Sequence, residues 1–189
     1  MPEMHEEDLA YCHYVGFANQ SLPTAVLGLL NEAGICTGTV VDLGCAGGYL
    51  LAALTAEGFR VVRGDGSYAA LSFAITVAPG AELHCSHAEA FDLLVCRAVT
   101  ALGEILCYLS IDDLHALLEI AILPRVFDAL APGGSLIFEV VVRDDANPFH
   151  HRHLRDVDDW FIDHGLMEDT RRHILCRNII LNQRVDGVW

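Results

Sequence analysis

The stretch TVVDLGCAGGYLLAAL (residues 39–54) joins a short apolar segment to a glycine-rich turn and then to a second apolar segment. The first part contains valines, which favour strands, and the last part contains leucine and alanine, which favour helices. A strand that ends in a glycine turn and leads into a helix gathers backbone N–H groups and the positive end of the helix at one point. This stretch therefore predicts a strand–loop–helix unit that binds a ligand at its turn.

The chain repeats this alternation as far as residue 142. Further strands are expected at 59–65, 81–85, within 91–102 and, after a Pro-Gly-Gly turn, in 131–142, and helices at 5–17, 21–34, 49–58, 67–78 and 112–130. Pro124 lies inside the last helix, where it is expected to cause a kink or a break. Strands that are apolar along most of their length indicate a parallel sheet covered on both faces. The predicted fold class is α/β, with a doubly wound, Rossmann-like and mostly parallel sheet.

The last part of the chain differs from the rest. Residues 143–159 are polar and rich in turn formers, and are expected to form a loop. Residues 160–169 and 172–189 resemble two antiparallel strands around a turn near Asp169–Arg171. We expect one domain over residues 1–189, with N-terminal helices (1–34), a Rossmann-like core (35–142) and a loop with a β-hairpin (143–189).

Charge and composition restrict the possible partners. The chain has 11 Lys and Arg against 26 Asp and Glu, a formal charge of −15 that repels nucleic-acid backbones. No apolar run reaches the roughly 18 uncharged residues needed to cross a bilayer. The start carries acids where a signal peptide has a basic leader. We therefore expect a cytoplasmic protein that binds a small molecule, with no nucleic-acid or membrane partner. The 7 cysteines include no CxxC pair and are read as small hydrophobic residues.

Two cofactor fingerprints compete for the glycine turn. The dinucleotide pattern G-x-G-x-x-G, read from Gly44, would place Tyr49 where a small residue must let the helix pack closely on the strand. The spacing D-x-G-x-G-x-G is matched instead at Asp42, Gly44 and Gly48, with Ala46 at the central position. In this respect the sequence resembles the first motif of the class I S-adenosylmethionine-dependent methyltransferases.

Other segments extend this resemblance over nearly the whole chain. GDGSYAAL (64–71) is similar to the family's G-x-D-x-S stretch, and LAPGGSLIF (130–138) to the turn before its fifth strand. EEDLAYCHYVGF (6–17) and VTALGEILCYL (99–109) resemble segments of a bacterial small-molecule methyltransferase subgroup, in which the first forms a lid. The resemblance implies S-adenosyl-L-methionine as cofactor and methyl transfer to a small-molecule acceptor. It implies the strand order 3-2-1-4-5, without the family's last two strands, and hence an uncovered sheet edge at which a homodimer could form.

The candidate site residues lie beyond the carboxyl ends of the strands, where doubly wound sheets bind their ligands. Asp42 is expected to order the loop or to receive the cofactor's ammonium group, directly or through water. Asp65 is expected to accept hydrogen bonds from the ribose hydroxyls. His87 is read either as a contact of the adenine, by stacking or donation, or as a plain loop histidine. The full cofactor-binding set is Tyr11, Asp42, Gly44, Cys45, Ala46, Gly48, Asp65, Gly66, Ser67, Ser86, His87 and Thr100. The candidate catalytic residues are His13, Glu104 and Tyr108, with Phe17 beside them on the lid.

Some features leave alternatives open. Ala46 replaces a glycine, and the fourth strand can be read with either Asp92 or Arg97 at the family's acidic position. These departures and the short C-terminal part give a second hypothesis, a truncated or degenerate homologue that binds the cofactor without catalysis. The histidine cluster HHRH (150–153) fits no zinc pattern, so no metal is expected.

Overall fold

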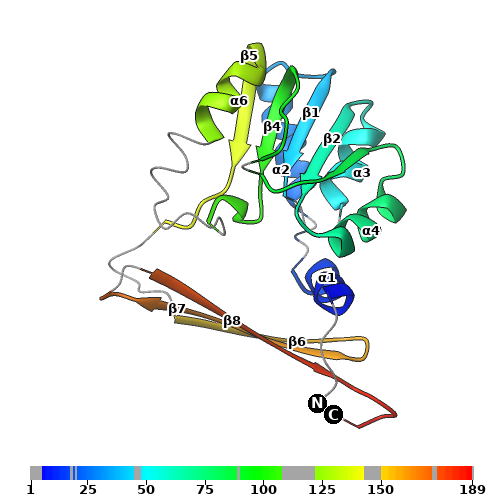
Figure 1. Cartoon of the computed structure of the whole chain (residues 1–189), viewed down its shortest axis with the longest axis vertical. Helices are drawn as coiled ribbons and strands as arrows, with labels where there is room; N and C mark the ends of the chain where they lie inside the picture. Colours follow the sequence, from blue (N-terminus) through cyan, green and yellow to red (C-terminus); the bar gives the residue numbers. More distant parts are fainter. Residues whose placement is uncertain are drawn as a thin grey trace.

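The core of the molecule is a five-stranded parallel sheet in the order β3-β2-β1-β4-β5, which confirms the predicted fold class (Figure 1). The structure is a computed structural model that describes residues 6–17, 19, 21–44, 48–88, 90–107, 122–142, 150–171 and 174–188. The core strands are β1 (Thr39–Leu43), β2 (Arg60–Asp65), β3 (Glu82–Cys85), β4 (Cys96–Ala101) and β5 (Leu130–Phe138).

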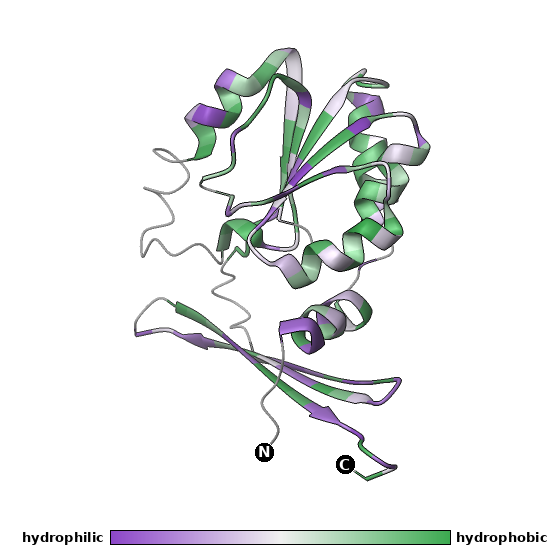
Figure 2. Cartoon of the chain, turned by 45° about the vertical axis from the view of Figure 1, so that its right-hand side comes forward, coloured by the Kyte–Doolittle hydropathy of each residue, from purple (hydrophilic) through white to green (hydrophobic). Residues whose placement is uncertain are grey.

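Helices cover both faces of this sheet. They are α2 (Leu22–Glu32), α3 (Tyr49–Ala56), α4 (Tyr68–Val77), the short 3-10 helix η1 (Ile105–Cys107) and α6 (Leu123–Ala129). A further helix, α1 (Glu6–Gly16), packs against α4. Alternate strand residues point to opposite faces, so Val40 packs with α2, α3 and α4 while Val41 packs with η1 and α6. Figure 2 shows the apolar colouring of these core strands. The sheet therefore lies between two layers of buried apolar side chains, one on each face.

The helix that contains Pro124 differs from its prediction. The proline stands at the beginning of α6 and not in its interior. The first helical position needs no N–H donor, and the fixed φ of proline suits it. The part of the predicted helix that precedes residue 122 lies outside the described residues.

The C-terminal part forms a second sheet of three antiparallel strands, in the order β6-β7-β8. The strands are β6 (His150–Val157), β7 (Trp160–Asp169) and β8 (Ile174–Gln183). The prediction of a loop over 143–159 was therefore wrong for its second half, because β6 pairs with β7 along its whole length. The predicted turn near Asp169–Arg171 is confirmed, since the Asp169 Oδ1 accepts a hydrogen bond from the Arg171 N–H at 3.1 Å.

Helix α1 lies between the core and the three-stranded sheet (Figure 1). Its Cys12 is fully buried and packs against Trp160 and Ile162 of β7. The opposite side of α1 contacts α4, where Tyr14 stacks on Phe73 with ring centroids 5.6 Å apart. Apolar and aromatic contacts on both sides thus hold the two sheets around one helix.

The fourth strand begins at Cys96, which decides between its two readings. Arg97 lies at the amino end of β4, where its guanidinium donates to the Pro132 carbonyl at 3.0 Å. Asp92 is exposed and precedes the strand. Neither residue stands at the carboxyl edge, so the family's fourth-strand acid has no counterpart at these two positions.

Strand β5 is the outer strand of the core sheet, and pairing of a second copy there stays a prediction. Among the described residues, no helix is both long and apolar enough to cross a membrane.

Candidate functional site

The glycine turn after β1 has a backbone that only glycine adopts easily. Gly44 and Gly48 have φ angles of 64° and 77°, in the left-handed region. A Cβ on Gly44 would lie 2.4 Å from the Ile105 Cγ1, and one on Gly48 would lie 3.2 Å from the Ala74 Cα. Both positions therefore exclude side chains. The predicted site residues Cys45 and Ala46 lie outside the described residues.

Asp42 is held at the end of β1 by the neighbouring strand. Its Oδ1 accepts a hydrogen bond from the Thr100 Oγ1 at 2.5 Å, and both residues are fully buried. The register explains the contact, because Asp42 and Thr100 are paired positions of β1 and β4. Thr100 thus touches Asp42 and fixes the direction of its carboxylate.

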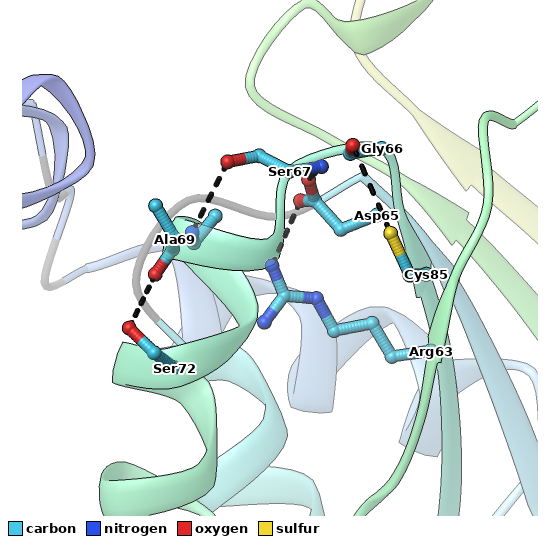
Figure 3. A network of polar contacts seen from close by, with 8 residues as sticks. Arg63, Asp65, Gly66, Ser67, Ala69, Ser72 and Cys85 are labelled. Carbon is cyan, nitrogen blue, oxygen red and sulfur yellow. Dashed lines mark hydrogen bonds and ion pairs between the residues drawn. The ribbon is translucent and has the colours of Figure 1, made fainter. Parts of the chain in front are cut away.

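Asp65 lies at the end of β2 in a small polar network (Figure 3). Its Oδ2 faces the Arg63 guanidinium at 2.8 Å, and its Oδ1 accepts from the Ser67 N–H at 2.9 Å. The Ser67 side chain caps α4 by accepting from the Ala70 N–H at 3.2 Å. The Arg63 side chain is fully buried, whereas that of Asp65 is 15% exposed. The carboxylate is therefore oriented by a buried cation and still reaches the surface.

The end of β3 lies beside Asp65. The Ser86 N–H donates to the Asp65 carbonyl at 3.0 Å. A Cβ on Gly66 would lie 2.6 Å from the His87 Nδ1, which places the exposed imidazole directly against the backbone after β2. The structure thus brings the predicted residues Asp65, Gly66, Ser67, Ser86 and His87 together at one corner of the sheet.

A cavity of about 310 Å³ adjoins this edge, next to Asp42. Distant segments of the chain form its walls: His13, Phe17, Asn19, Leu22, Pro23, Asp42, Tyr49, Leu50, Leu102, Gly103, Glu104, Glu139, His164 and Arg177. The predicted residues His13, Phe17, Asp42 and Glu104 are among them. Tyr108 lies outside the described residues. The end of α1 and strands β7 and β8 of the second sheet therefore form part of the cavity wall.

Tyr11 is not among the residues that line this cavity. Its hydroxyl donates to the Asp158 carboxylate in the turn between β6 and β7. This hydrogen bond, with some burial, raises the pKa of Tyr11 to about 12. In this structure Tyr11 joins α1 to the second sheet, and its contact with the cofactor stays a prediction.

Glu104 is placed by an unusual backbone and an ion pair. Its φ is 61°, a region that non-glycine residues seldom adopt and that is common at functional sites. Its Oε2 is paired with the Arg177 guanidinium of β8. Nearby, Glu139 accepts a hydrogen bond from the Gly103 N–H at 2.7 Å. The loop after β4 is thus held from two sides, with the Glu104 carboxylate at the cavity.

Two histidines that line the cavity are half-buried. Burial, followed by the nearby Arg177 and His164, lowers the pKa of His13 below its usual 6.5. Burial and the nearby His153 likewise lower the pKa of His164. Phe17 lies between their rings, with centroids 5.1 Å from each. Both imidazoles are therefore neutral at pH 7 and can accept a proton.

Residues that the sequence interpretation missed also line the cavity. His164 and Arg177 come from β7 and β8, which were read only as a hairpin, and Glu139 follows β5. Tyr14 stacks on Tyr49 with centroids 5.1 Å apart, directly after the glycine turn. The period-2 pattern of β7 puts His164 on the same face as Ile162, which was the available signal.

Similarity to known proteins appears in structure and not in sequence. No family model matches the chain, and no curated protein matches it. DesVI from Streptomyces venezuelae is similar at a TM-score of 0.69 and 16% identity, over 96% of this chain and 84% of that one. An amino pentose methyltransferase from Micromonospora echinaspora, solved with S-adenosylmethionine bound, is similar at a TM-score of 0.66 and 19% identity, over 97% of this chain and 84% of that one.

A third structure, a sugar N-methyltransferase from a Streptoalloteichus species, is similar at a TM-score of 0.64 and 17% identity, over 97% of this chain and 80% of that one. The strand order, the glycine turn after β1 and these likenesses agree. The chain therefore has the fold of the class I S-adenosylmethionine-dependent methyltransferases.

Proposed function

We propose that this protein transfers a methyl group from S-adenosylmethionine to a small-molecule acceptor. The observation that carries the proposal is the joint placement of the glycine turn, the oriented Asp65 carboxylate and a 310 Å³ cavity at one edge of the sheet. Two of the similar structures are named as an amino pentose methyltransferase and a sugar N-methyltransferase, which supports an acceptor of modest size.

The residues at the sheet edge fit this cofactor. Gly44 and Gly48 allow the left-handed backbone of the turn after β1, at which the cofactor would bind. Asp42 offers a carboxylate to an ammonium group, and Asp65 accepts hydrogen bonds from ribose hydroxyls. His87 lies at the corner where a nucleobase would follow the ribose. When bound, the cofactor supplies an electrophilic methyl group on sulfur.

The cavity residues act on the acceptor. Neutral His13 accepts a proton from an amine or hydroxyl of the acceptor as that group becomes the nucleophile. Glu104, held by Arg177, provides a fixed carboxylate that orients a polar group of the acceptor. The walls supplied by α1 and β7 shield the reacting atoms from water. A role for Tyr108 stays a prediction.

Calorimetric titration with S-adenosylmethionine and S-adenosylhomocysteine, with NAD as control, tests the proposal. Gly44→Ala should abolish binding, because a Cβ there would lie 2.4 Å from a neighbouring side chain at a φ of 64°. Gly28→Ala on α2 is the matched control, since a Cβ there meets nothing within 4 Å.

An acceptor screen that follows release of S-adenosylhomocysteine then tests turnover. Binding of the cofactor without turnover of any acceptor would favour the alternative, a homologue that binds without catalysis. Failure of the wild-type protein to bind either adenosyl ligand would overturn the proposed function.

A further inference from the structure

One face of the three-stranded sheet concentrates basic side chains. The register pairs His153 with His164, and alternation places His151, Arg155 and Arg177 on the same face. The acid on this face, Glu168, lies at its far end near the β7–β8 turn. This is unexpected in a chain with 26 acidic and 11 Lys and Arg residues. The sheet therefore presents a strip of histidine and arginine side chains towards α1 and the cavity.

A second, smaller cavity lies on this strip. It has a volume of about 110 Å³ and is lined by Phe17, His153, Arg155, Ile162 and His164. Phe17 and His164 also line the larger cavity, so the two cavities are neighbours that share a wall. One ligand can therefore occupy both, with its reacting end beside Glu104 and its other end beside Arg155.

The smaller cavity combines exposed His153 and Arg155 with one buried polar atom that has no partner in the described part of the chain, the His164 Nε2. Among the described residues, Arg155 forms no ion pair, whereas Arg177 pairs with Glu104 and Arg152, on the opposite face, pairs with Asp163. The His164 Nε2 is buried and has no hydrogen-bond partner within the described part of the chain. A buried ring nitrogen without a partner is costly, and an adjacent guanidinium adds repulsion when the ring is protonated. An anion relieves both.

We propose that the acceptor carries an anionic group, a carboxylate or a phosphate, which binds in the smaller cavity against Arg155, His153 and His164. This inference rests on the proposed function, because it assigns one end of the methyl acceptor. The Arg155 fork offers paired N–H donors to two oxygens, and the two imidazoles add further donors when the anion is present. The acidic remainder of the molecule repels anions elsewhere, which favours this strip.

The test uses inorganic phosphate and acetate as probes. The full chain is titrated with each salt at constant ionic strength in chloride, and the imidazole resonances of His153 and His164 are followed by NMR. Saturable shifts are expected in the wild-type protein. Arg155→Gln should weaken anion binding about tenfold, the effect of losing one charged hydrogen-bond donor. Arg171→Gln, the same change in the β7–β8 turn, should bind like the wild type.

The outcomes separate the alternatives. Response to phosphate alone supports a phosphate-bearing acceptor, and response to both salts supports an anion as small as a carboxylate. No saturable shift with either salt, or equal affinity in Arg155→Gln and the wild type, would overturn the inference. Binding of S-adenosylhomocysteine is measured on the same three proteins and should be equal in all. If none of the three proteins binds S-adenosylhomocysteine, the proposed function is refuted. The anion titrations then still show whether the smaller cavity binds an anion.

Discussion

Asp65→Asn tests the link between the proposed ribose site and the stability of the core. The substitution keeps the shape of the side chain but leaves a neutral amide against the buried Arg63 guanidinium. Removing one partner of a buried ion pair typically costs about 3–5 kcal/mol. The Asp65 side chain is 15% exposed, so the lower end applies, about 3 kcal/mol. For a chain of this size that lowers Tm by about 6–12 °C.

A double-mutant cycle separates this effect from cofactor binding. Arg63→Met with Asp65→Asn removes both charges, and replacing a buried pair by uncharged groups is often nearly neutral. The double variant should therefore recover about 2 kcal/mol relative to Asp65→Asn. Urea unfolding followed by circular dichroism gives the four free energies of unfolding, and calorimetry gives the affinity for S-adenosylhomocysteine.

The reasoning would be refuted by a coupling energy near zero or by an Asp65→Asn variant as stable as the wild type. The affinity for S-adenosylhomocysteine tests separately whether Asp65 binds the ligand. If Asp65 accepts hydrogen bonds from the ribose, the double variant should be folded and still bind S-adenosylhomocysteine weakly. Full affinity in the double variant would remove Asp65 from the cofactor site.

Two further predictions concern the edge of the sheet and the cavity. Thr100→Val should lower the free energy of unfolding by about 1.5–3 kcal/mol, because it deletes a buried hydrogen bond to the Asp42 carboxylate. Urea unfolding measures this change, with Thr39→Val, at the opposite end of β1 from Asp42, as the control. Equal stability of the two variants would contradict the prediction. Stability should fall as pH drops below about 6.5, because His13 and His164 bind protons more weakly in the folded than in the unfolded state. Between pH 7.5 and 5.5 the free energy of unfolding should fall less in a variant with both histidines replaced by Gln than in the wild type. An equal fall in the two proteins would show that these histidines do not cause it.

The parallel sheet could be predicted from sequence because its strands are short, apolar and separated by glycine turns. The limits of β4 could not, since FDLLVCRAVTAL (91–102) is apolar on both sides of the true start and contains no glycine or proline. The pairing of Cys96 with Leu130 and of Ala98 with Ser135 fixes the strand in the structure. The start of β4 is thus set by its pairing with β5, a contact between distant segments that the local sequence does not reveal.

Strand β6 could not be predicted because its pattern is not apolar. The face that it shares with His164 carries exposed His151, His153 and Arg155 in place of the valines or leucines that mark a half-buried strand. The ion pair of Arg63 was missed for a related reason, because an arginine within an apolar strand gives no sign of its partner two residues later. The candidate residues beside the glycine turn could be proposed from the spacing of the D-x-G-x-G-x-G motif. The cavity residues of β7 and β8 could not, because only the packing of the second sheet brings them to the cavity.

The three-stranded sheet supplies walls to the cavity, whereas the Asp65 contacts described above come from β2 and from the residues that follow β2 and β3. In β7 and β8 alternate side chains lie on opposite faces of the sheet, and the cavity residues His164 and Arg177 lie on the same face. Substitutions at 164 or 177 therefore change the cavity lining while the outer face and the core strands stay as they are. Under the proposed function, such a layout lets acceptor preference diversify without loss of the methyl donor. It also makes β6–β8 the segment to randomise or graft when an enzyme with a new acceptor is sought.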